Sequence, residues 1–323
     1  MPSSTLDHLA DAYTQVSLIN KRLLDAYEIV GQSFQQQGIE CILLKGADLL
    51  TRLYGMRGTR PLSDVDLLVH EQDLPAIHRL LIETGFTQQI DGNPAYCSSH
   101  CTLSLDLVSE LWYLDKEGLA ALWGRVRTRP LGRLTVKQLS STDLLLYLNA
   151  YSVVHRGHLT ASFLTDLRLL ITKEPIHWPA LVEEAHRRHL KIPLYHGLRQ
   201  LALSNPSLAV PAPVIQQLAP STIGERILEF LFQRLVATRP IPELGHFLLW
   251  ITQPPGHRLA WVRRAILPPS PFLAYRYGDM GIARPWQTRI ARWWHLTTAA
   301  SLLLTRILIR LTFWRTTRTV SCF

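Results

Sequence analysis

The hydrophobic pattern of this chain changes near Val136, and this change constrains its fold more than any other feature. Before that point, short apolar runs typical of buried strands alternate with segments of helical periodicity. Beyond it, helix-length segments broken by Pro, Gly and Asn dominate, and strand signals are almost absent. We therefore predict two domains. Residues 1–135 form an α/β core with an N-terminal helix, and residues 136–323 form a helical substrate-binding or scaffold region.

The first part of the chain is expected to contain three strands and three helices. Apolar residues at helical spacing predict a first helix that ends near Gly31 or Gly38. The predicted strands are CILLK (41–45), SDVDLLVH (63–70) and CTLSLDLV (101–108). The other predicted helices are GADLLTRLYG (46–55), closed by Gly55, and DLPAIHRLLIETG (73–85), capped by Asp73 and closed by Gly85. The basic segment 124–141 is expected to link the two domains.

Two carboxylates lie inside an otherwise apolar predicted strand. Asp64 and Asp66 project to the same side because side chains alternate along a strand, and two like charges held together favour a bound cation. On a later strand, Asp106 stands on the polar face, opposite Leu105 and Leu107. If that strand is a neighbour and faces the same way, the three carboxylates could hold two Mg²⁺ ions. We predict them as the metal ligands and catalytic residues of two-metal phosphoryl transfer.

A Lys-Gly pair lies upstream of the carboxylates, where the first strand turns into a helix. Gly46 at this turn would let backbone N–H groups approach a phosphate, and Lys45 would add a positive charge there. Arg57 and Arg60, just before the carboxylates, are suited to grip the same phosphates. These four residues are the predicted binding site for the phosphates of an NTP.

The net charge of +9 is unevenly distributed. Residues 1–124 hold 8 Lys/Arg against 16 Asp/Glu, whereas residues 125–323 hold 26 against 9. This asymmetry fits an acidic cation site beside a basic surface that attracts phosphates, nucleic acid or anionic lipid, and it also fits an ordinary basic surface. The four cysteines show neither CxxC nor zinc spacing, and no signal segment opens the chain, so we expect reduced thiols in the cytoplasm.

The segment WWHLTTAASLLLTRILIRLTFW near the C-terminus has the length of a membrane span, but Arg306 and Arg310 would lie in its middle. Its apolar residues recur at intervals of three and four and form one stripe: Trp293, Leu296, Ala300, Leu303, Ile307, Leu311 and Trp314. We predict an amphipathic helix whose stripe packs on the protein's own helices. A peripheral membrane contact or a partner helix is the alternative.

A family resemblance is carried by Lys45-Gly46, Tyr54, Arg60, Asp64-Val65-Asp66, Gly85-Phe86 and Asp106. This series resembles the uncharacterised bacterial nucleotidyltransferase family, which belongs to the DNA polymerase beta-like nucleotidyltransferase superfamily. The resemblance covers Gly38 to Leu111 and continues at His155 and Asp166. It implies an α+β fold with a mixed sheet, metals on three carboxylates and transfer of a nucleoside monophosphate from an NTP. His155 and Asp166 then become candidate substrate-binding residues.

Taken together, these features predict an Mg²⁺-dependent nucleotidyltransferase with an unidentified acceptor. The acceptor could be a small molecule, a peptide, a protein side chain or an RNA end; nucleic acid is less favoured because the sequence shows no RNA-binding module. The resemblance adds natural-product or polysaccharide biosynthesis as a context. The chain has Lys45-Gly46-Ala47 where the superfamily usually has Gly-Ser or Gly-Gly, and Val108 where relatives often have histidine. Two alternatives therefore stay open: a catalytically silent nucleotide-binding adaptor and a metal-dependent phosphodiesterase.

Overall fold

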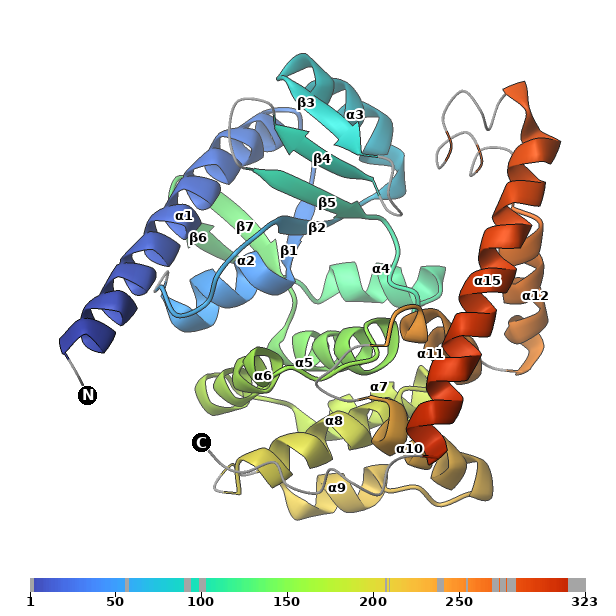
Figure 1. The fold of residues 1–323 in the computed structure, drawn as a ribbon. Helices are drawn as coiled ribbons and strands as arrows, with labels where there is room; N and C mark the ends of the chain where they lie inside the picture. The colour runs from blue at the N-terminus through green and yellow to red at the C-terminus, as the bar shows by residue number, and fades with distance from the viewer. Residues whose placement is uncertain are drawn as a thin grey trace. The chain divides into compact units, whose positions relative to one another are not determined.

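The computed structural model describes residues 3–55, 58–89, 94–98, 103–206, 208, 210–236, 241–253, 255–268, 273, 277 and 283–312. The chain forms two compact units, Met1–Asp143 and Leu144–Phe323. The first contains a sheet with helices and the second is helical, which is the predicted α+β class (Figure 1). The predicted domain limit after residue 135 falls inside strand β7 (Leu134–Gln138), and the domain limits remain a prediction.

The elements of the first unit include all three helices and all three strands predicted from the sequence. In chain order they are α1 (Ser3–Gln36), β1 (Cys41–Leu44), α2 (Lys45–Leu49), the π-helical turn η1 (Leu50–Tyr54), β2 (Val65–Val69), the 3-10 turn η2 (Glu71–Asp73), α3 (Leu74–Glu83), β3 (Phe86–Gln89), β4 (Ala95–Ser98), β5 (Ser104–Val108), α4 (Lys116–Gly124), β6 (Arg127–Leu131) and β7. Gly55 and Gly85 adopt left-handed conformations after η1 and α3, as predicted for helix ends. Asp73 precedes α3, but its side chain makes no capping hydrogen bond.

The strands form one mixed seven-stranded sheet in the order β3-β4-β5-β2-β1-β7-β6 (Figure 1). β1 pairs antiparallel with β2 and parallel with β7, and β2 pairs parallel with β5. The remaining pairs, β3 with β4, β4 with β5 and β6 with β7, are antiparallel. β2 and β5 are therefore neighbours in the centre of the sheet, although two strands separate them in the sequence.

The main core of the first unit lies between the sheet and helices α1 and α3. Leu23 and Tyr27 of α1 belong to the same buried cluster as Leu67 of β2 and Leu105 of β5. Val65, Leu67 and Val69 all enter this cluster, so the alternation of side chains along β2 turns Asp66 to the opposite face. The apolar face that anchors β2 thus also decides where its carboxylate points.

The basic segment that we expected to be a linker is instead a β-hairpin at one edge of the sheet. β6 is largely exposed and contains Pro130, which suits an edge strand because proline cannot donate a ladder hydrogen bond. The polar side chains of such a strand hide the alternation by which strands are recognised. The same reason applies to β3 and β4, which the sequence also did not predict and which are only partly buried.

Every regular element that the structure describes in the second unit is a helix. These are α5 (Ser141–Asn149), which begins in the first unit, the π-helical turn η3 (Ala150–His155), α6 (Ala161–Lys173), α7 (Trp178–Arg187), α8 (Lys191–Ser204), α9 (Ala212–Leu218), α10 (Ile223–Leu235), α11 (Leu244–Thr252), α12 (Pro255–Ile266) and α15 (Pro285–Thr312). Helix α8 packs against η3, α9 and α10 and forms the centre of this unit. The predicted helical character of the region is confirmed.

The long helix α15 carries the apolar stripe predicted near the C-terminus. It contacts α10, and Leu303 and Ile307 of the stripe are buried. Trp293 and Leu296 are half-buried and Ala300 is exposed. Trp314 and the side chain of Leu311 lie outside the described residues. Among the helices that the structure describes, none has the length and apolar character needed to cross a membrane.

Candidate functional site

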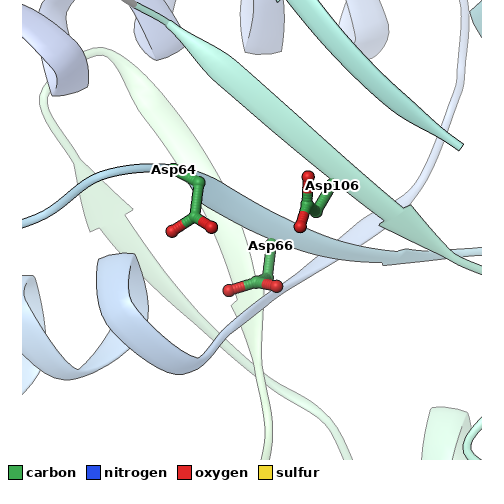
Figure 2. Close-up of side chains that lie close together, drawn as sticks. All are labelled: Asp64, Asp66 and Asp106. Atoms are coloured by element: carbon green, nitrogen blue, oxygen red, sulfur yellow. The ribbon is translucent and has the colours of Figure 1, made fainter. Parts of the chain in front are cut away.

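Three acidic side chains come together on the two central strands β2 and β5 (Figure 2). Asp66 on β2 lies opposite Asp106 on β5 in the parallel register, and Asp64 immediately precedes β2. Asp64 and Asp66 share a face because they are two residues apart on extended backbone. One carboxylate oxygen of each residue lies within 4.8 Å of those of the other two. The structure therefore places all three sequence-predicted acids in one cluster.

The environment of the cluster disfavours negative charge. The pKa of Asp66 is raised to about 6, mainly by burial; Lys45 opposes this rise, whereas Asp64 and Asp106 add to it. Burial and the neighbouring Asp64 also raise the pKa of Asp106, against the effect of Lys45. A cation bound among these carboxylates would relieve both the repulsion and the cost of burying charge. The three donors are carboxylate oxygens, the hard ligands that Mg²⁺ prefers, so the residues present fit a divalent cation.

Lys45 reaches directly into the acidic cluster. In the antiparallel pair of β1 and β2, Leu44 lies opposite Asp66, so the next residue is placed at the same end of the sheet. The Lys45 Nζ atom donates to Oδ1 of Asp66 at 2.5 Å. Lys45 has a φ of 43°, in the left-handed region that few residues other than glycine occupy. This strained conformation turns the chain from β1 into α2 within one residue and brings the ammonium group to the carboxylates.

Gly46 lies against the segment that leads to the carboxylates. A Cβ atom at this position would be 2.9 Å from Leu62 Cδ1 and 3.3 Å from the Arg60 guanidinium. Arg60 donates to the carbonyl oxygen of Gly46 at 3.4 Å, so Arg60, Gly46 and Lys45 form one group beside the acids. Gly46 thus has a packing role, and the predicted role in phosphate binding stays a prediction. Arg57 lies outside the described residues.

Asn20, in the middle of α1, fixes the approach to the site and was not predicted. It is fully buried; its side-chain amide donates to the Arg60 carbonyl oxygen at 2.9 Å and accepts from the Leu62 N–H at 2.9 Å. Asp64 follows two residues later, so these bonds help to set its position. The sequence did contain a signal, because Asn20 falls at helical spacing from Leu23 and Tyr27, where an apolar residue is expected.

A buried ionic network supports the helix that follows Lys45. Asp48 is fully buried and contacts Arg52 at 3.5 Å and Arg129 of β6 at 3.2 Å. Burial raises the pKa of Asp48, whereas Arg52 and Arg129 lower it. Arg129 also donates to Thr51 and to Gln138. The network ties α2 and η1 to the hairpin β6–β7, a connection that the linker interpretation of the basic segment could not reveal.

The two predicted substrate-binding residues belong to the second unit. His155 ends η3, is exposed and stacks on the ring of Tyr151 at a centroid distance of 5.2 Å. Asp166 lies on α6 and is 4% exposed. A buried aspartate in a helix is uncommon without a structural or functional reason. The part of these residues in substrate binding stays a prediction.

Comparison with known proteins adds four findings. A family model described as "Uncharacterised nucleotidyltransferase" matches residues 1–204, which include all three carboxylates and end with α8. The chain is similar to an antigenic nucleotidyltransferase-like protein from Paracoccidioides brasiliensis, with 16% identity and a TM-score of 0.38, over 61% of this chain and 93% of that chain. It is also similar to the antibiotic-resistance factor ANT(2'')-Ia, with 13% identity and a TM-score of 0.38, over 57% of this chain and 95% of that chain. No curated protein matches the sequence.

Proposed function

The chain belongs to the uncharacterised nucleotidyltransferase family, and from this premise we propose that it transfers a nucleoside monophosphate from an NTP to an acceptor. The observation that carries the proposal is the convergence of Asp64, Asp66 and Asp106 within 4.8 Å on adjacent central strands. In the reaction, an acceptor oxygen or nitrogen bonds to the α-phosphorus. The bond from that phosphorus to the β-phosphate oxygen breaks, and pyrophosphate leaves.

The three carboxylates would hold two Mg²⁺ ions. When bound, these ions supply activation of the acceptor and neutralisation of charge on the leaving pyrophosphate. Asp66 is the most buried of the three and anchors the site from the centre of the sheet. Asp106 is half-buried on β5, opposite Asp66, and would complete the ligand set, and the acceptor's proton would pass to solvent.

The group beside the acids would bind the triphosphate. Lys45 already places its ammonium next to Asp66, so a phosphate that approaches the carboxylates also approaches this positive charge. Arg60 stands beside Gly46 and can extend the same positive surface toward the phosphates. Arg57 completes the proposed set from the sequence. These residues would orient the pyrophosphate as it departs, while the carboxylates hold the metal ions at the α-phosphorus.

The acceptor is unidentified, and the proposal includes a small molecule, a peptide or a protein side chain. His155 and Asp166 are the proposed acceptor-binding residues. A role in natural-product or polysaccharide biosynthesis would supply acceptors of these classes.

One observation favours a second candidate, a nucleotide-binding adaptor without activity. The ion pair between Lys45 and Asp66 already neutralises a proposed metal ligand at 2.5 Å. If the ammonium permanently occupies the place of a cation, a nucleotide could bind and no transfer would follow. The same acids with water as the acceptor would instead make the protein a phosphodiesterase.

A single experiment separates these candidates. Each NTP, labelled at the α-phosphate, is incubated with the protein, Mg²⁺ and an extract of the source organism. We expect label to appear on an acceptor together with an equal amount of pyrophosphate. Nucleotide binding without pyrophosphate release would identify the adaptor. Release of the label as free nucleoside monophosphate, with no labelled acceptor, would show that water is the acceptor and identify a hydrolase. Chelation with EDTA is the control for the metal.

A further inference from the structure

Helix α15 presents apolar side chains to solvent beside the stripe that packs on α10. These residues, which we call the apolar flank, are Trp286, Ile290, Trp294, Leu304 and Leu308, and each is more than half exposed. At 100° per residue they span an arc of about 80° on the helix. The flank therefore forms one continuous face that the described part of the second unit leaves uncovered.

Two polar side chains within this arc, Thr297 and Ser301, donate their hydroxyl hydrogens to carbonyl oxygens of their own helix. The Thr297 hydroxyl donates to the Trp294 carbonyl oxygen at 2.9 Å, and the Ser301 hydroxyl donates to the Thr297 carbonyl oxygen at 2.9 Å. Hydroxyl groups that bond back to their own helix are satisfied without solvent. The flank can therefore enter an apolar environment without leaving these two donors unpaired.

Helix α12 extends the same surface. Trp293 donates from its ring nitrogen to the Ile266 carbonyl oxygen at 2.6 Å, and Arg292 donates to the Ala265 carbonyl oxygen at 3.1 Å. These bonds hold the end of α12 beside α15, as Figure 1 shows, and Ile266 and Leu267 are exposed there. The surface thus spans two helices and includes side chains from both.

The part of the sequence that contains this surface is strongly basic. From Leu244 to the end of the sequence there are eleven arginines and no lysine, and Asp279 is the single acidic residue. The same segment contains six of the nine tryptophans. Arg289 lies over the ring of Trp286 at 4.9 Å, and Arg263 is exposed on α12, three and four residues before Ile266 and Leu267. Tryptophan is favoured at the boundary between lipid and water, and arginine is attracted to anionic headgroups.

We propose that the apolar flank of α15, with the end of α12, docks on the surface of an anionic lipid bilayer. The apolar side chains would enter the boundary between headgroups and acyl chains, and the arginines would supply the electrostatic attraction. This inference is independent of the proposed transfer reaction, because none of its residues belongs to the carboxylate site.

Two other occupants fit less well. A second copy of the chain that covers the flank by a two-fold contact would bring arginine-rich segments together, and α15 contains no acidic residue to compensate them. Nucleic acid would satisfy the arginines but would leave the exposed leucines and isoleucines against a polar backbone. An anionic bilayer meets both the apolar and the cationic requirement.

Helix α1 supplies the internal contrast. It also exposes apolar side chains, among them Leu9 at 58% and Ile29 at 69%. Yet α1 contains four acidic and two basic residues, whereas α15 contains four arginines and no acid. If exposed apolar side chains alone decided membrane binding, both helices would bind. If positive charge is also required, only α15 should bind.

The test is co-sedimentation of the full chain with vesicles of phosphatidylcholine, alone or mixed with phosphatidylglycerol. We expect binding to the mixed vesicles only. The double variant Trp294→Ser/Leu308→Ser should need at least about tenfold more lipid for half-maximal binding. The matched double variant Leu9→Ser/Ile29→Ser should bind like the unaltered protein. Circular dichroism checks that both variants keep the native helical content.

A charge variant separates the two contributions. Arg263→Glu leaves the apolar flank intact and should weaken binding to the mixed vesicles by about fivefold. Arg263 is exposed on α12, three and four residues before Ile266 and Leu267, so two units of charge change beside the docking surface. Equal binding of Trp294→Ser/Leu308→Ser and the unaltered protein would overturn the proposal. So would equal binding to both kinds of vesicle. Self-association in solution that this double variant abolishes, without vesicle binding, would assign the flank to a second copy instead.

Discussion

The two units carry opposite charge imbalances and accommodate them differently. Residues 1–143 hold 13 Lys/Arg against 17 Asp/Glu, and residues 144–323 hold 21 against 8. In the first unit, Asp48 and Asp66 are buried, each beside a basic side chain. In the second, Arg263 and Arg306 are among the arginines that remain exposed. Charge that is buried must be compensated by a specific neighbour, whereas exposed charge acts collectively through its field.

The basic segment 125–137 shows how this difference arises. It looks like the start of the basic half, yet in the structure it compensates acids of the first unit. Arg125 pairs with Asp143 at 2.8 Å, and Lys137 pairs with Glu40 at 2.6 Å. The sequence turns from acidic to basic near residue 125. The acidic unit, however, continues to Asp143, because the basic hairpin β6–β7 belongs to its sheet.

The largest effect expected from the comparison concerns the acids of the first unit. Asp64→Asn or Asp66→Asn should lower Mg²⁺-dependent NTP turnover by at least about a hundredfold, because each removes the charge of a metal ligand. The fold should survive, since repulsion within the cluster is relieved. Asp25→Asn, which alters an exposed acid paired with Lys21 in α1, is the control and should keep full turnover. Unchanged turnover in both site variants would end the metal-site hypothesis.

The next effect is a pH dependence of stability in the metal-free protein. The pKa of Asp66 is raised from 3.8 to about 6 on folding, so the native state keeps a proton that the unfolded chain loses. As pH rises from about 4 to about 6, the native state is therefore destabilised, by about 3 kcal/mol in all. Asp66→Asn lacks this penalty. Urea unfolding in EDTA should show the variant gaining on the unaltered protein across this interval, and a constant difference would contradict the assignment.

Asn20 tests whether a buried polar side chain of the first unit stabilises the fold more than a surface one of the second unit. Asn20→Ala should lower the free energy of unfolding by about 2 to 3 kcal/mol, because it leaves the Leu62 N–H and the Arg60 carbonyl without their partner. The matched change in the second unit is Asn205→Ala, whose side chain donates to the exposed Ser204 hydroxyl at 3.1 Å. We expect that change to cost less than about 0.5 kcal/mol. If denaturant unfolding shows the same loss of stability in Asn20→Ala and Asn205→Ala, the buried hydrogen bonds of Asn20 have no special effect.

Adjacent leucines of α15 test the two faces of that helix. Leu303 is 9% exposed and packs in the second unit, whereas Leu302 is 57% exposed. Leu303→Ala should lower the free energy of unfolding by about 2 kcal/mol, and Leu302→Ala by about 0.5 kcal/mol or less. Thermal unfolding of the two variants measures the difference. If both melt alike, the packing of α15 on its own unit is not what holds the helix.

The smallest effect concerns phosphate binding. Lys45→Ala should weaken NTP affinity about tenfold, through loss of one charge-assisted contact. Lys137→Ala is the matched control, because Lys137 also pairs with an acid. Its partner Glu40 lies just before the start of β1, whereas Lys45 follows the end of that strand. Calorimetric titration with a non-hydrolysable NTP analogue measures both. Equal affinities would make Lys45 a partner of Asp66 alone.

Much of the first unit could be predicted from local pattern. Apolar runs and helix-ending glycines located β1, β2, β5 and the helices between them, because their periodicity is strong. β3, β4 and β6 were missed since they are short and partly exposed, so their polar residues show no alternation. The same limit made the hairpin β6–β7 look like a linker and concealed the contacts of Arg129 with Asp48 and Thr51.

By itself, the sequence determined that Asp64 and Asp66 share one face and that Asp106 stands on the polar face of its own strand, because alternation is a local property of extended backbone. Tertiary structure decided that β5 pairs with β2 in a register that sets Asp106 opposite Asp66. It also decided that Leu44 lies opposite Asp66, so that Lys45 becomes its partner. Strand order and register depend on packing between residues far apart in the chain, and no short stretch of sequence contains that information.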